Sequence, residues 1–226
     1  MYISQLKLDL SSNIARRDFA KIYEMHRSIL RAFPEEGKGG PGRVLYRIDL
    51  LRREGIALVL VQSDKKPDWN LLNPAVDYFA SVPEVKEFNP NFKNGQTFTF
   101  CLRANPTYRK KEPEGQKGRR LGLYSESDLA TWFLRKANHA GFMVTDLEES
   151  ISEARPCKNL VIIKEGRMEV HRPVGGRVQT HDAVKFEGKI TVIDSELFLK
   201  ALESGLGSGK GFGFGLLSLA PLRVSE

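Results

Sequence analysis

A run of glycines near the C-terminal end constrains the fold of this chain more than any other feature. From Gly205 to Gly215 a glycine stands at every second position, and the apolar segment LLSLAPL follows at once. Glycine has no Cβ atom, so this backbone can approach another backbone or a phosphate closely. The run follows a helix-like stretch at 195–204 and precedes a strand-like one. It either ends a helix with a glycine-rich bulge or forms part of a binding site.

The spacing of these glycines argues against the two common nucleotide-binding loops. Both the phosphate loop of ATPases and the dinucleotide-binding fingerprint need a pair of glycines with four residues between them. Every glycine of the run has an odd number, so no pair has that spacing. Those loops also lead from a strand into a helix, and the order here is the reverse. A nucleotide-dependent metabolic enzyme is therefore disfavoured.

The chain is basic, which indicates a polyanionic partner. It has 226 residues, with 35 Lys and Arg against 28 Asp and Glu, and a formal net charge of +7. The basic residues gather at 16–17, at 108–120 and at 155–177. Clusters of this kind are typical of proteins that bind nucleic acid. Any one of them alone would also fit a solvated surface.

Several other classes of protein do not fit the sequence. No apolar run approaches a membrane span of roughly 20 residues, and the opening MYISQLKLDL alternates like a strand and does not resemble a signal peptide. Cys101 and Cys157 are too few for a disulfide framework. The four histidines share no metal-ligand spacing, and there is no acidic cluster like those that bind magnesium. We predict a cytoplasmic protein with no membrane partner, no cofactor and no metal site.

The apolar patterns predict the same order of strands and helices in each half of the chain. In the first half we expect strand, helix, strand, strand, weak helix and strand at 2–10, 19–33, 44–50, 56–63, 70–80 and 96–104. In the second half we expect that order at 120–124, 125–141, 159–172, 178–193, 195–204 and a final strand after the glycine run. The order βαββαβ is that of a ferredoxin-like (RRM-like) domain. The sequence thus predicts an α+β fold with two tandem ferredoxin-like domains, at 1–106 and 117–226.

The segment YEMHR at 23–27 is the best candidate for acid–base chemistry. Tyr23 and His26 are neighbours on a helix, and Arg27 projects to the side on which Tyr23 lies. Histidine titrates near neutral pH and can give or take a proton. RNA permits cleavage by side-chain chemistry, because its 2′-hydroxyl is a nucleophile held next to the phosphate. His26 also falls within the apolar stripe of its helix, so a buried structural histidine is the alternative.

A basic hairpin at 158–179, with PVGGR as its turn, is the second candidate. A basic two-stranded ribbon can contact the phosphates and base edges of a duplex. The major groove of RNA is deep and narrow, so entry usually requires a groove widened at a helix end or loop. A solvated hairpin explains the same residues equally well.

Together these residues resemble a known family, the CRISPR repeat-cleaving endoribonuclease of type I-E systems called CasE. The similar segments cover essentially the whole chain. They are MYISQL at the start, YEMHR at 23–27, FCLRANP at 100–106, VQT and FEG within 178–188, and GLGSGKGFGFGLLSLAPL at 205–222. YEMHR and the glycine run with LLSLAP are highly specific in combination.

The resemblance implies a fold and an activity. Members have two ferredoxin-like domains, cut precursor CRISPR RNA at the base of the repeat stem-loop without metal, and leave a 2′,3′-cyclic phosphate. They typically stay on the product as a subunit of Cascade. The family's catalytic histidine corresponds to His26, its assisting tyrosine to Tyr23, and an adjacent basic position to Arg27.

The resemblance also implies a basic groove on the second domain, with a hairpin that enters the major groove of the RNA stem. Its nearest equivalents here are Arg135, Lys136, Lys158, Arg172 and Arg177. With the other basic positions, the full set of predicted RNA-binding residues is Arg16, Arg17, Arg103, Arg109, Lys110, Arg135, Lys136, Lys158, Arg172, Arg177 and Lys210.

Three questions stay open at the level of sequence. A catalytically silent scaffold subunit that binds the RNA hairpin is the alternative to an endoribonuclease. His26 fits either proton acceptor or proton donor, and we favour acceptor. If the helix starts near Lys21 rather than Asp18, His26 lies close to its N-terminus, where the helix dipole would lower its pKa. We expect the glycine run to pack between the helix at 195–204 and the final strand, with Lys210 turned toward RNA.

Overall fold

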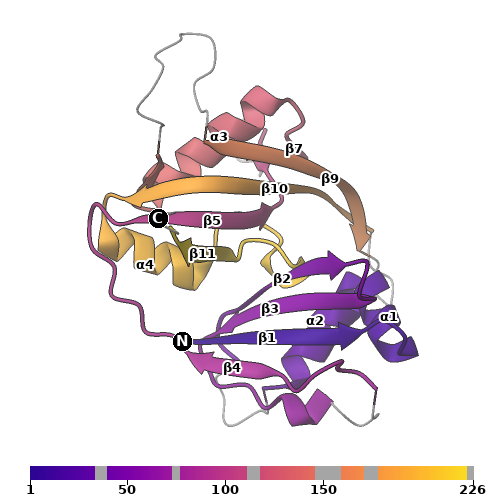
Figure 1. Ribbon diagram of the computed structural model, residues 1–226. Helices are drawn as coiled ribbons and strands as arrows, with labels where there is room; N and C mark the ends of the chain where they lie inside the picture. The colour runs from indigo at the N-terminus through magenta and orange to yellow at the C-terminus, as the bar shows by residue number, and fades with distance from the viewer. Residues whose placement is uncertain (34–39, 73–76, 111–117, 146–158, 171–177, 223–226) are drawn as a thin grey trace. The chain divides into compact units, whose positions relative to one another are not determined.

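The computed structural model describes residues 1–33, 40–72, 77–110, 118–145, 159–170 and 178–222 (Figure 1). The chain forms two compact units. Unit 1 contains Met1–Pro90, Glu169–Thr180 and Gly209–Leu216, and unit 2 contains Asn91–Met168, His181–Ser208 and Leu217–Glu226. The glycine run is therefore divided between them, since its second part belongs to the unit that holds the N-terminus.

Unit 1 is built on an antiparallel sheet with the strand order β2-β3-β1-β4. Its strands are β1 (Tyr2–Asp9), β2 (Val44–Leu51), β3 (Ile56–Ser63) and β4 (Glu84–Glu87). Helices α1 (Asn13–Ala20) and α2 (Ile22–Arg31) follow β1 and lie on one face of the sheet (Figure 1). The first strand lies between the third and the fourth, which is the ferredoxin-like arrangement. A short 3₁₀ helix, η1 (Trp69–Leu72), lies where that fold has its second helix.

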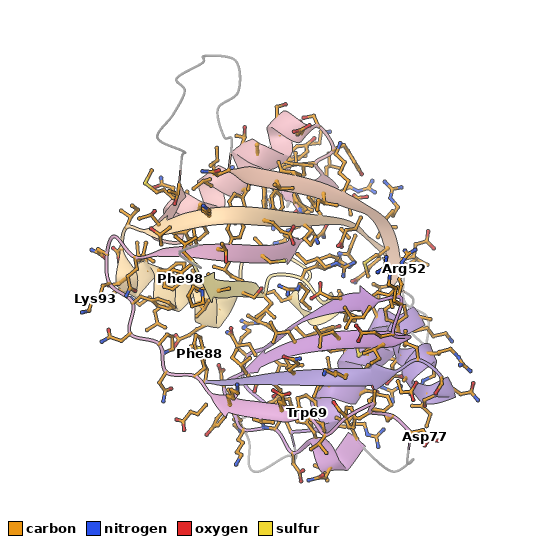
Figure 2. The ribbon with its side chains drawn as sticks, viewed as in Figure 1. Arg52, Trp69, Asp77, Phe88, Lys93 and Phe98 are labelled. Atoms are coloured by element: carbon orange, nitrogen blue, oxygen red, sulfur yellow. The ribbon has the colours of Figure 1, made fainter. Side chains whose placement is uncertain are left out.

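Alternate residues of the central strands form the core of unit 1. Leu6 and Leu8 of β1 lie opposite Val59 and Ala57 of β3, and all four are almost completely buried. The period of two follows from the pleat of a strand, which sends successive side chains to opposite faces. Trp69 of η1, labelled in Figure 2, is also buried.

The helix expected at 19–33 is confirmed by α2 (Ile22–Arg31), but it begins later than expected, and Phe19 belongs to the separate helix α1. Lys21 separates α1 from α2 and has extended backbone angles, with φ −120° and ψ 92°. The prediction followed apolar side chains only, and began with Phe19, which is half-buried. The buried residues of α1 are Ala15 and Asp18, and the charged side chain of Asp18 has no exposed surface.

Asp18 is buried because it accepts several hydrogen bonds at once. The hydroxyl of Ser28 in α2 donates to it over 2.5 Å, and the hydroxyl of Tyr78 donates over 2.9 Å. The guanidinium of Arg17 adds a charged contact at 2.7 Å. Burial and the negative charge of Asp18 both raise the pKa of Tyr78, so its hydroxyl stays a donor. The carboxylate thereby fastens α1 to α2 and to the segment that precedes β4.

Replacing Asp18 with Ala should destabilise the protein strongly. The change leaves the hydroxyls of Ser28 and Tyr78 without their acceptor, at about 1–3 kcal/mol for each buried group left unpaired. We expect the free energy of unfolding, measured by urea denaturation, to fall by roughly 3 kcal/mol. As a control, Glu187→Ala removes a partly exposed ion pair with Lys185 and should cost less than about 1 kcal/mol. Equal losses in the two variants would contradict the role given to Asp18.

The second sheet has the strand order β11-β5-β10-β8, with β9 also pairing with β10. Its strands are β5 (Thr97–Ala104), β8 (Phe142–Val144), β9 (Leu160–Val170), β10 (Gln179–Val192) and β11 (Leu217–Pro221). Helices α3 (Glu126–His139) and α4 (Ser195–Ser204) occupy the two helix positions of the repeat. This sheet also has the ferredoxin-like order, so the chain is an α+β protein with two such folds.

The strand expected at 96–104 forms, but its assignment to the first sheet was wrong. That strand is β5, which pairs with β10 and β11 and thus opens the second sheet instead of closing the first. The fourth strand of the first sheet is β4, a short polar segment, EVKE, with no apolar alternation to reveal it. The strand expected at 120–124 is β7 (Arg120–Gly122), which pairs with β6 (Thr107–Arg109) in a separate ribbon. The pairing favours a division near Asn91 over the predicted division between 106 and 117.

Stacked aromatic rings fill the core of unit 2. Phe133 of α3 stacks on Phe100 of β5 and on Phe186 of β10, with ring centroids 5.1 and 5.0 Å apart. At the edge of this cluster lies Phe98, which is labelled in Figure 2. Its ring contacts that of Phe92 edge to face, with centroids 5.6 Å apart. The α3 helix begins as the sequence indicates, because the hydroxyl of Ser125 accepts a hydrogen bond from the Asp128 amide. No helix among the described residues is long and apolar enough to cross a membrane.

Candidate active site

Helix α2 presents the three residues singled out as catalytic. Its buried side includes Ile22, Met25 and Ile29, whose spacing follows the helical period. Tyr23 and His26 are half-buried, and Arg27 is exposed. The guanidinium of Arg27 lies 3.3 Å from the carboxylate of Glu24, one turn earlier in the helix. Such a surface ion pair is weak, so Arg27 can exchange Glu24 for another anion.

The imidazole of His26 is held between two neighbours from distant parts of the chain. It stacks on the ring of Tyr46 in β2, with centroids 6.3 Å apart and an angle of 17° between the planes. Its Cε1 and Nε2 atoms face Gly211, where an added Cβ atom would lie 3.4 Å from each. Its Nδ1 atom is buried and has no hydrogen-bond partner within the described part of the chain.

Burial lowers the pKa of His26 below the ordinary histidine value of 6.5. A buried imidazole loses hydration mainly in its charged form, so the neutral form is favoured. His26 is therefore neutral at neutral pH and has a lone pair available to accept a proton. The lowered pKa was expected from the helix N-terminus, but its cause here is loss of hydration.

Nuclear magnetic resonance can test this ionisation directly. In the free protein, the Cε1 proton of His26 should titrate with a midpoint below 6.5, because the folded environment disfavours the imidazolium. A peptide that spans residues 22–31 provides the unfolded reference and should titrate near 6.5. A midpoint in the protein equal to or above that of the peptide would contradict the burial of the ring.

Tyr46 connects residues 209–216, here called the glycine segment, to α2. Its hydroxyl lies 3.1 Å from the carbonyl oxygen of Gly211 and 3.4 Å from that of Ile22, and its hydrogen bond is shared between the two. Its ring is fully buried, and an added Cβ atom on Gly213 would lie only 3.2 Å from it. Residues 209–216 thus pack in unit 1 and not between α4 and β11 as expected. No sequence motif marked Tyr46, and the glycine spacing was the only signal of this contact.

Two of the predicted RNA-binding residues of unit 1, Arg16 and Arg17, already make contacts within the protein. Arg16 donates to the carbonyl oxygens of Leu10 and Ser11 at 3.0 and 2.8 Å. Arg17 pairs with Asp18, and 48% of its side chain remains exposed. Lys210 is the first residue of the short 3₁₀ helix η2 (Lys210–Phe212). Its neighbour in sequence, Gly211, lies beside the ring of His26.

The predicted residues of unit 2 differ in how exposed they are. Arg103 of β5 is mostly buried and pairs with Glu165 at 2.5 Å. Arg109 and Lys110 lie at the end of β6 and are exposed. On α3, Arg135 is exposed, while Lys136 is half-buried with its Nζ 6.0 Å from the ring centroid of Trp132. Lys158, Arg172 and Arg177 lie outside the described residues.

The described strands of the basic hairpin carry a small polar network. The guanidinium of Arg167 in β9 lies 3.3 Å from Asp182 and 3.1 Å from the hydroxyl of Tyr124. That hydroxyl donates to Asp182 over 3.0 Å. Asp182 thus compensates part of the charge of Arg167 within the protein itself.

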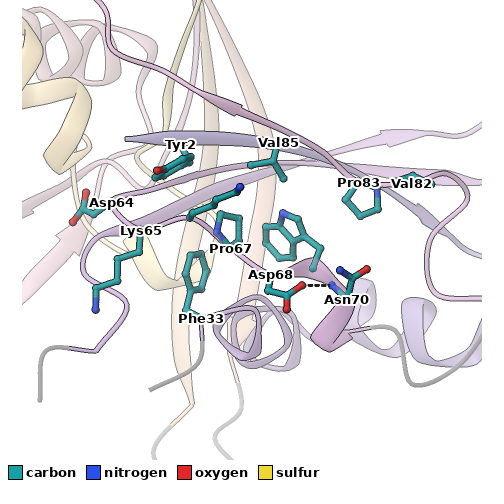
Figure 3. Close-up of a pocket in the computed structure, with 12 residues that line it drawn as sticks. Tyr2, Phe33, Asp64, Lys65, Pro67, Asp68, Asn70, Val82, Pro83 and Val85 are labelled. Carbon is teal, nitrogen blue, oxygen red and sulfur yellow. Dashed lines mark hydrogen bonds between the residues drawn. The ribbon is translucent and has the colours of Figure 1, made fainter. Parts of the chain in front are cut away.

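A separate pocket of about 830 Å³ lies beside β4 in unit 1 (Figure 3). Its lining includes Lys65, Lys66, Phe33 and Val82. Asp68, also on its wall, accepts a hydrogen bond from the Asn70 amide at 3.1 Å at the start of η1. None of the predicted catalytic or RNA-binding residues lines it. Within the described ranges, no three His, Cys, Asp or Glu side chains gather as a metal site requires.

Comparison with known proteins agrees with the motifs. The chain is 35% identical over 225 residues to the CRISPR-associated endoribonuclease Cse3 of Thermus thermophilus, covering 98% of this chain and 100% of the relative. It is 29% identical over 216 residues to the Cascade subunit CasE of Escherichia coli, covering 92% and 96%. A solved structure of Cse3 bound to a 19-nucleotide RNA superposes with a TM-score of 0.83 at 34% identity, covering 98% of this chain and 100% of that one.

The resemblance to CasE is therefore confirmed across nearly the whole length, including both ferredoxin-like folds and the helix that carries His26. The family model for CRISPR associated proteins matches residues 1–221. On these grounds the chain belongs to the family of CRISPR-associated proteins.

Proposed function

We propose that this protein is an endoribonuclease that cleaves precursor CRISPR RNA at the base of the repeat stem-loop and stays bound to its product as a Cascade subunit. The setting of His26 carries the proposal: a neutral imidazole is stacked on a buried tyrosine, and Tyr23 lies one turn away on the same helix. Relatives named as a CRISPR-associated endoribonuclease and as a Cascade subunit support the activity and the assembly. The similar structure bound to RNA supports the substrate class.

The reaction uses the RNA's own 2′-oxygen as nucleophile. A bond forms between that oxygen and the adjacent phosphorus, while the bond from phosphorus to the 5′-oxygen of the next nucleotide breaks. The products are a 2′,3′-cyclic phosphate and a 5′-hydroxyl. Neutral His26 takes the 2′ proton, and the departing 5′-oxygen gains a proton from the Tyr23 hydroxyl or from water. Arg27 supplies positive charge near the phosphorane.

Metal independence follows from this chemistry as part of the proposal. The nucleophile is already attached to the substrate, so no metal is needed to generate it. The remaining tasks are proton transfer and charge stabilisation, which an imidazole and a guanidinium can perform.

The RNA stem is held by basic side chains that neutralise its phosphates. The exposed Arg109, Lys110 and Arg135 are suited to this, and contacts of this type weaken steeply with salt. Arg103 is suited to positioning more than to open contact, because its guanidinium is engaged with Glu165. We place the protein in the cytoplasm, because a sequence with only two cysteines fits a reducing compartment.

The decisive test is cleavage of the host's own repeat RNA in EDTA. Wild-type protein should give a product with a 2′,3′-cyclic phosphate, identified by mass spectrometry. His26→Ala should lower the single-turnover rate by about a hundredfold to ten-thousandfold, the usual contribution of general acid–base catalysis. The affinity for RNA, measured by filter binding, should change little, because a neutral histidine adds no phosphate charge.

The matched control is His139→Ala. His139 is an exposed histidine at the end of α3, whose Nδ1 lies 2.6 Å from the Arg135 carbonyl oxygen. This variant should cleave at the wild-type rate. Tight hairpin binding by the wild type with no cleavage would favour the silent scaffold, and undiminished cleavage by His26→Ala would remove His26 from the mechanism.

A further inference from the structure

We propose that a pocket in unit 2, formed by β9, β10 and the segment before α3, binds the base of one unpaired nucleotide of the RNA. The inference rests on the proposed function, because it takes RNA as the ligand, and it adds a binding site that none of the catalytic residues lines. It is carried by the lining of the pocket, by an exposed aromatic ring held at its rim, and by the positive charge beside that ring.

The pocket has the size and the floor that a nucleobase requires. Its volume is about 400 Å³, within the range of roughly 300–1,000 Å³ that is usual for pockets that hold small ligands. Its lining includes Leu129, Ala183 and Val184, which are almost completely buried and form an apolar floor. A flat ring that enters such a pocket leaves water for an apolar surface, which favours binding.

Tyr124 lines the same pocket and is both exposed and held in place. The residue is 56% exposed, a large fraction for an aromatic side chain. Its hydroxyl nevertheless donates to the carboxylate of Asp182 over 3.0 Å and accepts from the guanidinium of Arg167 over 3.1 Å. A ring that is already fixed through its hydroxyl loses little freedom when a base stacks on it, so stacking costs less entropy.

A glycine makes room for this pair of polar groups. An added Cβ atom on Gly122 would lie 2.5 Å from Oδ2 of Asp182 and 2.9 Å from the hydroxyl of Tyr124. Any side chain at 122 would therefore displace one or both groups. The backbone of Asp182 is fixed as well, because its amide donates to the side chain of Asn105 over 3.1 Å. The place of the Tyr124 hydroxyl is thus determined by the backbone around it.

Positive charge lies beside the ring. Lys164 and Arg167 of β9 both line the pocket and are exposed. Asp182 compensates one of these charges, so the three charged lining residues together remain positive. A nucleotide joins a flat base to a phosphate. The pocket offers an aromatic ring and an apolar floor to the base, and cations to the phosphate.

The nucleotide must be unpaired. Within a duplex the neighbours in the stack cover both faces of a base, so an aromatic side chain stacks only on bases outside the stem. A repeat stem-loop has such nucleotides in its loop and beside the stem. Contact with the phosphates of the stem would use Lys164 and Arg167 but would give no role to the exposed ring of Tyr124.

The test is a set of repeat RNAs in which each unpaired nucleotide in turn lacks its base. Nucleotides at the base of the stem carry no 2′-hydroxyl, so the RNA stays intact during the measurement. In filter binding, the full-length wild type should bind one RNA of the set about tenfold more weakly than the complete sequence, as expected for the loss of one base stacked on an aromatic ring. Tyr124→Ala should bind these two RNAs with equal affinity, because the base no longer has a ring to stack on.

Tyr124→Phe separates stacking from the hydrogen bonds of the hydroxyl. It keeps the ring and removes only the group that contacts Asp182 and Arg167. We expect this variant to bind the RNA that lacks the base at least threefold more weakly than the complete sequence. If Tyr124 had only a structural role through its hydroxyl, the Phe variant would behave like the Ala variant, and the inference would be wrong.

Lys164→Ala tests the phosphate contact. It should weaken the binding of every RNA in the set alike and lower the slope of log affinity against log salt concentration by about one. The matched control is Lys93→Ala, which removes an exposed lysine of the same unit that does not line the pocket (Figure 2). It should leave the slope unchanged, and equal slopes in the two variants would contradict the contact with Lys164.

Two further results would overturn the inference. In the first, each missing base weakens the wild type and Tyr124→Ala to the same extent. In the second, Tyr124→Ala distinguishes the RNAs as the wild type does but no longer assembles with the host's other Cascade subunits, which would assign the pocket to a protein partner. Neither result bears on the proposed function, which is refuted when the wild type does not cleave unmodified repeat RNA in EDTA.

Discussion

A hydrogen bond joins Tyr46 to Gly211, 165 positions later in the chain, and the arrangement around His26 depends on it. Closing so long a loop is entropically unfavourable. The contact therefore needs support from a fully buried ring that also stacks on the imidazole. The support is mutual, because the carbonyl of Gly211 gives the buried hydroxyl an acceptor. A polar group without one would be costly at this depth.

The helix that carries His26 is also fixed by the buried carboxylate of Asp18. Asp18 accepts a hydrogen bond from Ser28, two residues after His26, and another from Tyr78. A carboxylate buried with these partners tolerates little displacement, because each donor left unpaired would destabilise the fold. Helix α2 is thus fixed to α1 by Asp18 and to the glycine segment through Tyr46. Precise placement of one imidazole is what proton transfer requires.

Sequence alone predicted the local elements well and their partners poorly. Alternation revealed β1, β3 and β5, and the helical period with the Ser125 cap revealed α3. The sequence could not show that β5 belongs to the second sheet. Apolar alternation identifies a strand but does not indicate which strands it pairs with. The break at Lys21 was missed because the prediction counted apolar residues only, and Asp18, a buried residue of α1, is polar. YEMHR identified the chemistry, yet nothing in VLYRIDL distinguishes Tyr46 from an ordinary strand residue.

The glycine run shows why a repeat of one residue type can serve two purposes. Five of its glycines have positive φ and fold the segment tightly, while Gly211 has an unstrained backbone against the face of His26. Regular spacing concealed this difference, since every second position carries the same residue. If conformation were the only requirement, Gly211 could have been alanine at a gain in stability, because alanine restricts the unfolded chain. Glycine at 211 is best explained by the close approach of this backbone to the ring of His26, where an added Cβ atom would already lie 3.4 Å from Cε1 and Nε2.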